Sequence, residues 1–217
     1  MFRQIGEAVL DLVYPRFCIG CKKSGVLLCH DCFCEIDFYF MPIRLQLDPI
    51  FIDQYLVVAR LEGIVRKLVH QLKYNGVKEL ATVAGELLYL CSEWPDADLV
   101  TAVPLHKNRL GERGYNQAAL IGQSFADRAN LPYVELLKRT VNTPHQAQQE
   151  TREDRAQNLT NHFALIQSSI IKEKILEKHI IIVDDVCTTG ITLNHCAKVL
   201  KDSGCKTITA LTLAHGR

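Results

Sequence analysis

The chain has 217 residues, of which 23% are charged and 48% hydrophobic, and its formal net charge at pH 7 is +1. This length allows one full α/β domain with a small appendage. The near-neutral balance argues against a strongly basic nucleic-acid binder, although it leaves room for local patches. No apolar run approaches the ~20 residues that span a bilayer. Acidic Glu7 and Asp11 are untypical of a secretory signal, so we expect a cytoplasmic protein without membrane insertion.

The chain opens with a helical pattern and continues into a cysteine-rich block. Apolar residues at Phe2, Ile5, Val9, Leu12 and Val13 predict a helix that ends at Pro15. Five of the nine cysteines then fall within residues 18–34. The other four cysteines are scattered, and in a cytosolic protein we expect them to be small buried side chains rather than disulfides.

Four of the clustered cysteines have a spacing that suits a metal ion. Two Cys-x-x-Cys pairs around a short loop can form a tetrahedral Zn²⁺ site. A redox motif is the weaker alternative, because a thioredoxin-like pair occurs once and within a βαβ unit. We therefore predict a structural Zn²⁺ site, with His30 and Cys34 as alternative ligands; its four expected ligands are Cys18, Cys21, Cys29 and Cys32.

Strand and helix patterns alternate from about residue 54 to the end of the chain. This alternation is typical of a parallel sheet with helices on both faces, and we expect an α/β fold. The predicted division is an N-terminal helix and zinc-binding module over residues 1–50 and an α/β domain over residues 51–217. The expected strands cover 55–59, 99–103, 134–137, 163–166, 180–183 and 207–213, and the expected helices cover 63–72, 78–91, 116–129 and 192–203.

The most informative stretch runs from Ile180 to Leu193. A buried apolar strand is followed by Asp184 and Asp185, then by a hydroxyl-rich turn with Gly190, then by a helix. Such a turn directs backbone N–H groups and a helix N-terminus at one anion, while the acids suit vicinal hydroxyls or Mg²⁺. These features predict a phosphorylated-sugar site. An ordinary βα turn is the alternative, but it needs no paired acids, and the P-loop and dinucleotide-binding patterns are absent from the sequence.

A second loop follows the predicted strand over residues 99–103. It carries His106, Lys107, Arg109 and Arg113. Because ligands of open α/β sheets lie beyond the carboxyl ends of the strands, we expect this loop to approach the Asp184 turn. Clustered basic residues there suit a pyrophosphate group. Read alone, the loop also fits a solvated basic face at the start of a helix.

Residues 60–78 are basic and contain aromatic side chains. Arg66, Lys67, Lys73 and Tyr74 could follow the phosphates of a single strand and stack a base. The alternative is a solvated helix face beside an active site, and the residues themselves favour that alternative.

The Asp184 turn closely resembles the PRPP-binding motif of type I phosphoribosyltransferases. With the four cysteines and the stretch V-P-L-x-x-x-R-x-x-x-R-G-Y-N-Q that begins at Val103, the chain resembles the ComF family of competence-associated, phosphoribosyltransferase-like proteins (the ComFC/GntX type). The resemblance extends over essentially the whole chain. It implies a type I phosphoribosyltransferase fold with a small Cys₄ zinc-finger-like module at its N-terminus.

The resemblance also implies roles for particular residues. Asp184, Asp185 and Arg109 would be catalytic, with the acids on the ribose hydroxyls, directly or through Mg²⁺. The implied PRPP-binding turn comprises Asp184, Asp185, Val186, Thr188, Thr189, Gly190 and Thr192, and the implied pyrophosphate loop comprises Pro104, Leu105, His106, Lys107, Arg109 and Arg113. A flexible loop over residues 139–158, with Arg139, Gln146, Arg152 and Arg155, would cover the site and exclude water.

The implied function is a Mg²⁺-dependent, PRPP-binding phosphoribosyltransferase-like activity in natural competence and DNA uptake, with an unidentified acceptor. The alternative is a non-catalytic module that reuses the pocket for single-stranded DNA or a nucleotide. Expected partners are PRPP or another phosphorylated sugar, single-stranded DNA and DNA-uptake proteins.

Overall fold

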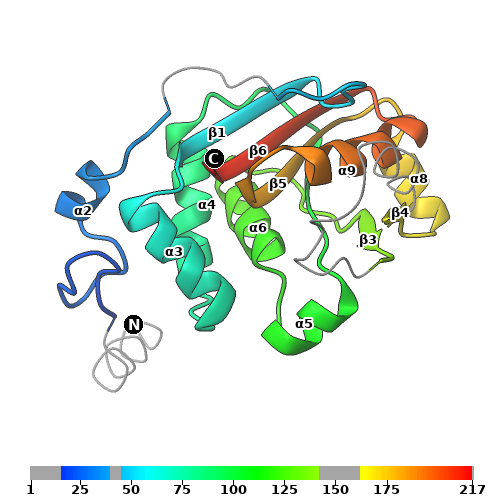
Figure 1. Cartoon of the computed structure of the whole chain (residues 1–217). Coiled ribbons are helices and arrows are strands. Elements are labelled where there is room, and N and C mark those ends of the chain that lie inside the picture. Colours follow the sequence, from blue (N-terminus) through cyan, green and yellow to red (C-terminus); the bar gives the residue numbers. More distant parts are fainter. Residues whose placement is uncertain (1–15, 40–44, 142–161, 217) are drawn as a thin grey trace, which may run out of the picture.

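A computed structural model of the chain describes residues 16–39, 45–141 and 162–216. Its centre is a sheet of four parallel strands in the order β1-β6-β5-β2 (Figure 1). The predicted parallel sheet is confirmed. Its strands are β1 (Gln54–Arg60), β2 (Leu99–Ala102), β5 (His179–Cys187) and β6 (Thr207–His215).

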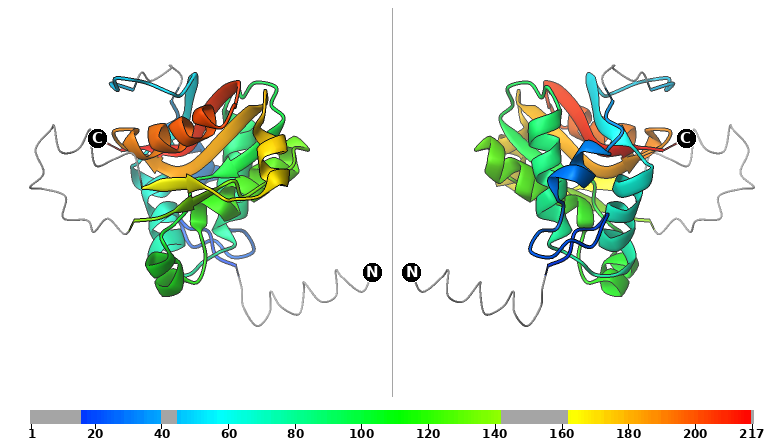
Figure 2. Two further views of the ribbon diagram at one scale, coloured as in Figure 1. Left: turned by 90° about the vertical axis from the view of Figure 1, so that its right-hand side faces the viewer. Right: turned by 90° about the vertical axis from the view of Figure 1, so that its left-hand side faces the viewer.

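Helices cover both faces of this sheet (Figures 1 and 2). On one face, α3 (Gly63–Tyr74), α4 (Leu80–Cys91) and α6 (Gln117–Ala129) share a hydrophobic cluster with Ile181 and Val183 of β5. On the other, α9 (Ile191–Asp202) shares a second cluster with Ile180 and Ile182. Successive side chains of a strand point to opposite faces, so a strand covered twice needs an unbroken apolar run.

Two predicted strands differ from the observed ones. β5 continues past Val183 through both acids, because β6 is long enough to pair with it as far as Cys187. The strand expected over 134–137 is instead β3 (Leu137–Arg139), which pairs antiparallel with β4 (Phe163–Leu165) in a separate sheet. The preceding residues are attached to the β2 edge only by isolated contacts, such as the Val134 N–H with the Val100 carbonyl at 2.9 Å.

Three short helices were not expected from the sequence. They are α2 (His30–Cys34), α5 (Lys107–Arg113) and α8 (Ser169–Ile175). They have only five to seven residues each, too few for an apolar repeat to be recognised, so the sequence alone does not distinguish them from loops. The helix predicted before Pro15 lies outside the described residues.

The cysteine-rich segment packs onto the α/β domain. Cys18, Ile19, Cys32 and Ile36 belong to the same hydrophobic cluster as α3 and α4. The segment therefore extends an existing core, and the division at residue 50 stays a prediction. Within the described ranges, no helix has the length and apolar character needed to cross a membrane.

Candidate functional site

The two acids lie at the carboxyl end of β5, the central strand on which both helical layers pack. Asp185 is almost completely buried, with 4% of its side chain exposed, whereas Asp184 is partly exposed. The Asp185 backbone N–H donates to Asp184 Oδ1 at 2.8 Å. The two carboxylates therefore have different surroundings, one facing the protein interior and the other facing the turn.

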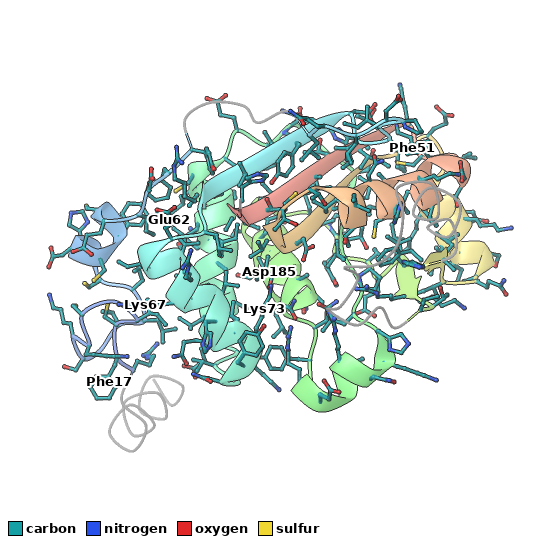
Figure 3. All side chains as sticks on the ribbon, in the orientation of Figure 1. Phe17, Phe51, Glu62, Lys67, Lys73 and Asp185 are labelled. Atoms are coloured by element: carbon teal, nitrogen blue, oxygen red, sulfur yellow. The ribbon has the colours of Figure 1, made fainter. Side chains whose placement is uncertain are left out.

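Lys73 is the counter-ion of Asp185. Its Nζ lies 2.9 Å from Asp185 Oδ2, and its side chain is 23% exposed (Figure 3). Lys73 occupies the last turn of α3, far from the acids in sequence. The sequence analysis placed this lysine with the nucleic-acid candidates, and nothing in its spacing indicated that it reaches the acid pair.

Burial changes the acidity of the pair. Desolvation, followed by the negative charge of Asp185, raises the pKa of Asp184 well above its usual range, and the positive charge of Lys73 opposes this rise. Two acids crowded in this way are stabilised by an additional cation or by hydroxyl donors. The donor set therefore fits Mg²⁺ or a ribose diol, since oxygen ligands are those that Mg²⁺ prefers.

The turn after β5 provides an anion-binding geometry. Thr188 and Thr189 are exposed, Thr192 is partly buried, and Gly190 is the N-cap of α9 with φ +80°. A small cavity of about 50 Å³ lies between the turn and Asp184. Cys187, within this turn, is buried, and desolvation raises the pKa of its thiol, so the group is a neutral packing residue.

The second loop begins beside the acids. The Val103 N–H donates to the Val183 carbonyl at 3.0 Å, so this loop leaves β2 next to Asp184. Asn116 fixes its far end, donating from Nδ2 to the Val103 carbonyl at 2.9 Å while its side chain caps α6. The two loops expected to face one another thus leave adjacent strands at one edge of the sheet.

A larger cavity, which we call the basic cavity, lies between the end of α3 and α5. Its volume is about 550 Å³, and it contains three basic side chains and one acid; its lining residues are Lys73, Tyr74, Gly76, Arg109, Glu112 and Arg113. Arg109 and Arg113, both expected in the pyrophosphate loop, therefore meet here with Lys73. The sequence analysis did not predict that Tyr74, Gly76 and Glu112 line this cavity.

The remaining residues of the expected pyrophosphate loop have other surroundings. His106 is buried and caps α5, accepting from the Asn108 N–H at 3.3 Å. Pro104 and Leu105 are partly buried, and Lys107 is exposed. Val186, expected in the PRPP-binding turn, packs against the first hydrophobic cluster and also lines the small cavity.

Arg139 is the described member of the expected flexible loop. Burial, followed by the positive charge of Arg109, lowers its pKa, while the charge of Asp184 acts in the opposite direction. Arg139 therefore lies within electrostatic range of Arg109 and Asp184. Gln146, Arg152 and Arg155 lie outside the described residues.

The nucleic-acid candidates on α3 separate into two groups. Arg66, Lys67 and Tyr74 are exposed, and Tyr74, with 66% of its surface exposed, contacts the His70 ring at a centroid distance of 5.0 Å. These positions share one face of α3. Lys73 turns instead toward Asp185, as Figure 3 shows.

The four predicted zinc ligands form one cluster. The sulfur atoms of Cys18, Cys21, Cys29 and Cys32 all lie within 4.8 Å of one another. The Sγ atoms of Cys18 and Cys29 are 3.6 Å apart, close to the ~3.8 Å edge of a tetrahedron with Zn–S bonds of ~2.3 Å. The arrangement fits Zn²⁺.

The crowding of the four sulfur atoms shifts the acidity of individual thiols in opposite directions. Although burial acts to raise the pKa of the Cys18 thiol, backbone hydrogen bonds lower it below its usual value. Desolvation, followed by hydrogen bonds with Cys29 and Cys18, raises the pKa of the Cys32 thiol. His30 and Cys34 pair with each other at 3.7 Å rather than joining the cluster.

Comparison with known proteins was made in sequence and in structure. A family model described as a phosphoribosyl transferase domain matches residues 116–217. Competence protein F of Haemophilus influenzae is 28% identical over 94% of this chain and 93% of its own length. The DNA utilization protein YhgH of Escherichia coli O157:H7 is 28% identical over 88% of this chain and 85% of its own.

Over most of its length the chain is thus similar to proteins named for competence and for DNA utilization. Its α/β domain is of the phosphoribosyltransferase type, as the family match and the parallel sheet agree. An adenine phosphoribosyltransferase from Thermoanaerobacter pseudethanolicus is 18% identical, with a TM-score of 0.44 over 71% of this chain and 75% of that chain.

Proposed function

We propose that this protein binds PRPP with Mg²⁺ and transfers the 5-phosphoribosyl group in the context of DNA uptake. The observation that carries the proposal is the meeting of an acid pair, a threonine-rich turn and a basic cavity at one edge of the sheet. Diol, phosphate and pyrophosphate are the three parts of PRPP, and each has a chemically matched surface. The expected cytoplasmic location, where thiols stay reduced, is part of this proposal.

The roles follow from the chemistry of each surface. Asp184 and Asp185 hold the ribose hydroxyls, the Thr188–Thr192 turn holds the 5-phosphate, and Arg109 and Arg113 hold the pyrophosphate. The bond between C1 and the pyrophosphate oxygen breaks, pyrophosphate leaves with the electron pair, and the acceptor bonds to C1 and loses its proton. Positive charge develops on the sugar, and the carboxylates of the acid pair stabilise it electrostatically.

Both metal ions have separate purposes in this proposal. When bound at the acid pair, Mg²⁺ supplies charge neutralisation for the leaving pyrophosphate. Zn²⁺ at the cysteine cluster is structural, because four thiolates leave no open coordination position.

Ligand-dependent stabilisation tests the PRPP site directly. PRPP with Mg²⁺ should raise the melting temperature of the wild type, because a ligand that binds only the folded state stabilises it. The double variant Asp184→Asn with Asp185→Asn should lose this shift. A shift that persists in the double variant rejects the site. Pyrophosphate release against a panel of bases, amines and single-stranded DNA then distinguishes transfer from binding alone.

A second candidate function is the binding of single-stranded DNA or a nucleotide. The observation that favours it is the exposed α3 face with Arg66, Lys67 and Tyr74, which borders the basic cavity. A 5′-terminal phosphate could occupy the phosphate turn while the adjoining base stacks on Tyr74.

Oligonucleotide binding measured at several salt concentrations tests this second function. Tyr74→Ala should weaken binding by ~1–3 kcal/mol, the usual contribution of one stacked base. Lys67→Gln should reduce the slope of log affinity against log salt. Equal affinity for 5′-phosphorylated and 5′-hydroxyl strands would count against use of the phosphate turn.

A further inference from the structure

Lys73 stands between two regions that suit different charged ligands. On one side its Nζ lies 2.9 Å from Asp185 Oδ2. On the other it lines the basic cavity with Arg109 and Arg113. One flexible ammonium group can therefore serve the acid pair or an anion in the cavity.

The burial of Asp185 explains why Lys73 lies where it does. With 4% of its side chain exposed, the carboxylate has little access to water, and a buried charge must be paired. The Asp185 backbone N–H donates to the Asp184 carboxylate, so it does not serve the carboxylate of Asp185. The neighbouring acid therefore adds negative charge and does not neutralise Asp185. Among the described residues, Lys73 is the cation in an ion pair with this carboxylate.

The end of α3 is held by contacts of the residues on either side of Lys73. Tyr115 donates from its hydroxyl to the carbonyl of Leu72, the residue before Lys73. Tyr74, the residue after it, faces the Arg113 guanidinium at 5.9 Å from its ring centroid. The backbone is thus fixed on both sides, while the Lys73 stem retains its four rotatable bonds.

We propose that Lys73 exchanges its counter-ion during ligand binding. In the ligand-free protein it neutralises Asp185; when a divalent cation occupies the acid pair, Lys73 is released into the basic cavity and binds the pyrophosphate group with Arg109 and Arg113. This inference rests on the proposed function and adds a residue from α3 to the pyrophosphate site. It implies that cation and pyrophosphate assist each other's binding through Lys73.

The test measures the affinities for Mg²⁺ and for inorganic pyrophosphate in separate calorimetric titrations of the full chain. Lys73→Met should bind Mg²⁺ alone about tenfold more tightly than the wild type, because the competing cation is gone. In EDTA, Asp185→Asn should bind pyrophosphate about tenfold more tightly, because Lys73 is free to reach it. The double variant Lys73→Met with Asp185→Asn should lose that gain in pyrophosphate affinity. A gain due only to the missing negative charge would persist in it.

Further variants separate this mechanism from a loss of folding. Lys73→Met leaves Asp185 without its counter-ion, whereas the double variant removes both charges and should melt close to the wild type. Lys73→Arg should retain pyrophosphate binding. Lys172 is an exposed lysine of α8. Its replacement in Lys172→Met removes the same charge elsewhere and should change neither the Mg²⁺ affinity nor the pyrophosphate affinity.

The outcomes distinguish this inference from the function on which it rests. If Lys73→Met binds Mg²⁺ no more tightly, or if the pyrophosphate gain persists in the double variant, counter-ion exchange is wrong while PRPP binding stands. If the wild type binds neither Mg²⁺ nor PRPP, both proposals fail. If the role of Lys73 is only structural, Lys73→Met should weaken the binding of both ligands together. That result would also overturn the inference.

Discussion

The hydroxyl of Tyr115 donates a hydrogen bond to the main-chain carbonyl of Leu72. This contact joins the start of α6 to the last turn of α3, the turn that carries Lys73. Tyr115 itself is buried, and the Lys78 ammonium lies over its ring at 5.0 Å from the centroid. The α3 wall of the basic cavity is therefore fastened to the segment that connects α5 with α6.

We expect Tyr115→Phe to lower the free energy of unfolding by about 1–3 kcal/mol, because it leaves the buried Leu72 carbonyl without its donor. Chemical denaturation gives this value. Tyr89→Phe is the matched control, since that ring packs on Trp94 at 5.9 Å, and it should cost less. Equal losses in the two variants would contradict a special role for the Tyr115 hydroxyl.

Zinc content provides a second prediction. The purified protein should contain zinc, and Cys29→Ser should lose it, because the four thiols form one site. Chelation should lower the melting temperature of the whole domain, since Cys18 and Cys32 share the core of α3 and α4. Metal analysis and thermal unfolding measure the two effects.

Cys34 provides the control for the zinc site. It is exposed and pairs with His30 outside the cluster, so Cys34→Ser should retain the metal. Loss of zinc in this variant would mean that Cys34 replaces one of the four ligands.

Gly190 should tolerate no side chain. Its φ is +80°, and a Cβ there would lie 2.7 Å from Leu45 Cδ1. Gly190→Ala should therefore lower the free energy of unfolding by more than the ~1–2 kcal/mol expected for an alanine in the left-handed conformation. Gly63→Ala, with φ +48° and no atom within 4 Å of the added Cβ, isolates that backbone cost. Denaturation of both variants, and of Gly190→Ala with Leu45→Ala, separates the steric contribution, which should disappear in the double variant.

Asp184 should titrate at a higher pH than an ordinary aspartate. Desolvation and then the charge of Asp185 raise its pKa, so Asp185→Asn should lower it again, and Lys73→Met should raise it further. Carbon NMR of the carboxyl group follows each change in the ligand-free protein. A titration near pH ~4 in the wild type would contradict this environment.

The same shift affects stability with a defined sign. Because the folded protein holds the Asp184 proton more tightly than the unfolded chain, this residue destabilises the fold progressively as pH rises through its raised pKa. Asp184→Asn removes that contribution. Its melting temperature, relative to the wild type, should therefore increase from pH 5 to pH 8.

Local patterns in the sequence determined the sheet, the main helices and the metal cluster. The run Ile180–Val183 predicted a doubly covered strand, because only a strand buried on both faces needs apolar residues at every position. The cysteine spacing predicted one cluster, because two Cys-x-x-Cys pairs across a short loop bring their sulfurs together without help from the rest of the fold.

Short or polar elements could not be predicted in the same way. The extension of β5 to Cys187 depends on the length of its neighbour β6, and the position of β3 depends on pairing with Phe163–Leu165. Strand ends are set by their partners, which a local pattern does not contain.

Tertiary structure alone decided which charges meet. Asp185 was recognisable as a functional acid from its neighbours in sequence, but its pairing with Lys73 depends on how α3 crosses the end of the sheet. Lys73 shares its helix turn with exposed Tyr74, and nothing local distinguishes the side chain that turns inward. A buried carboxylate requires some cation, and only the position of α3 beside the end of β5 determines that this cation is Lys73.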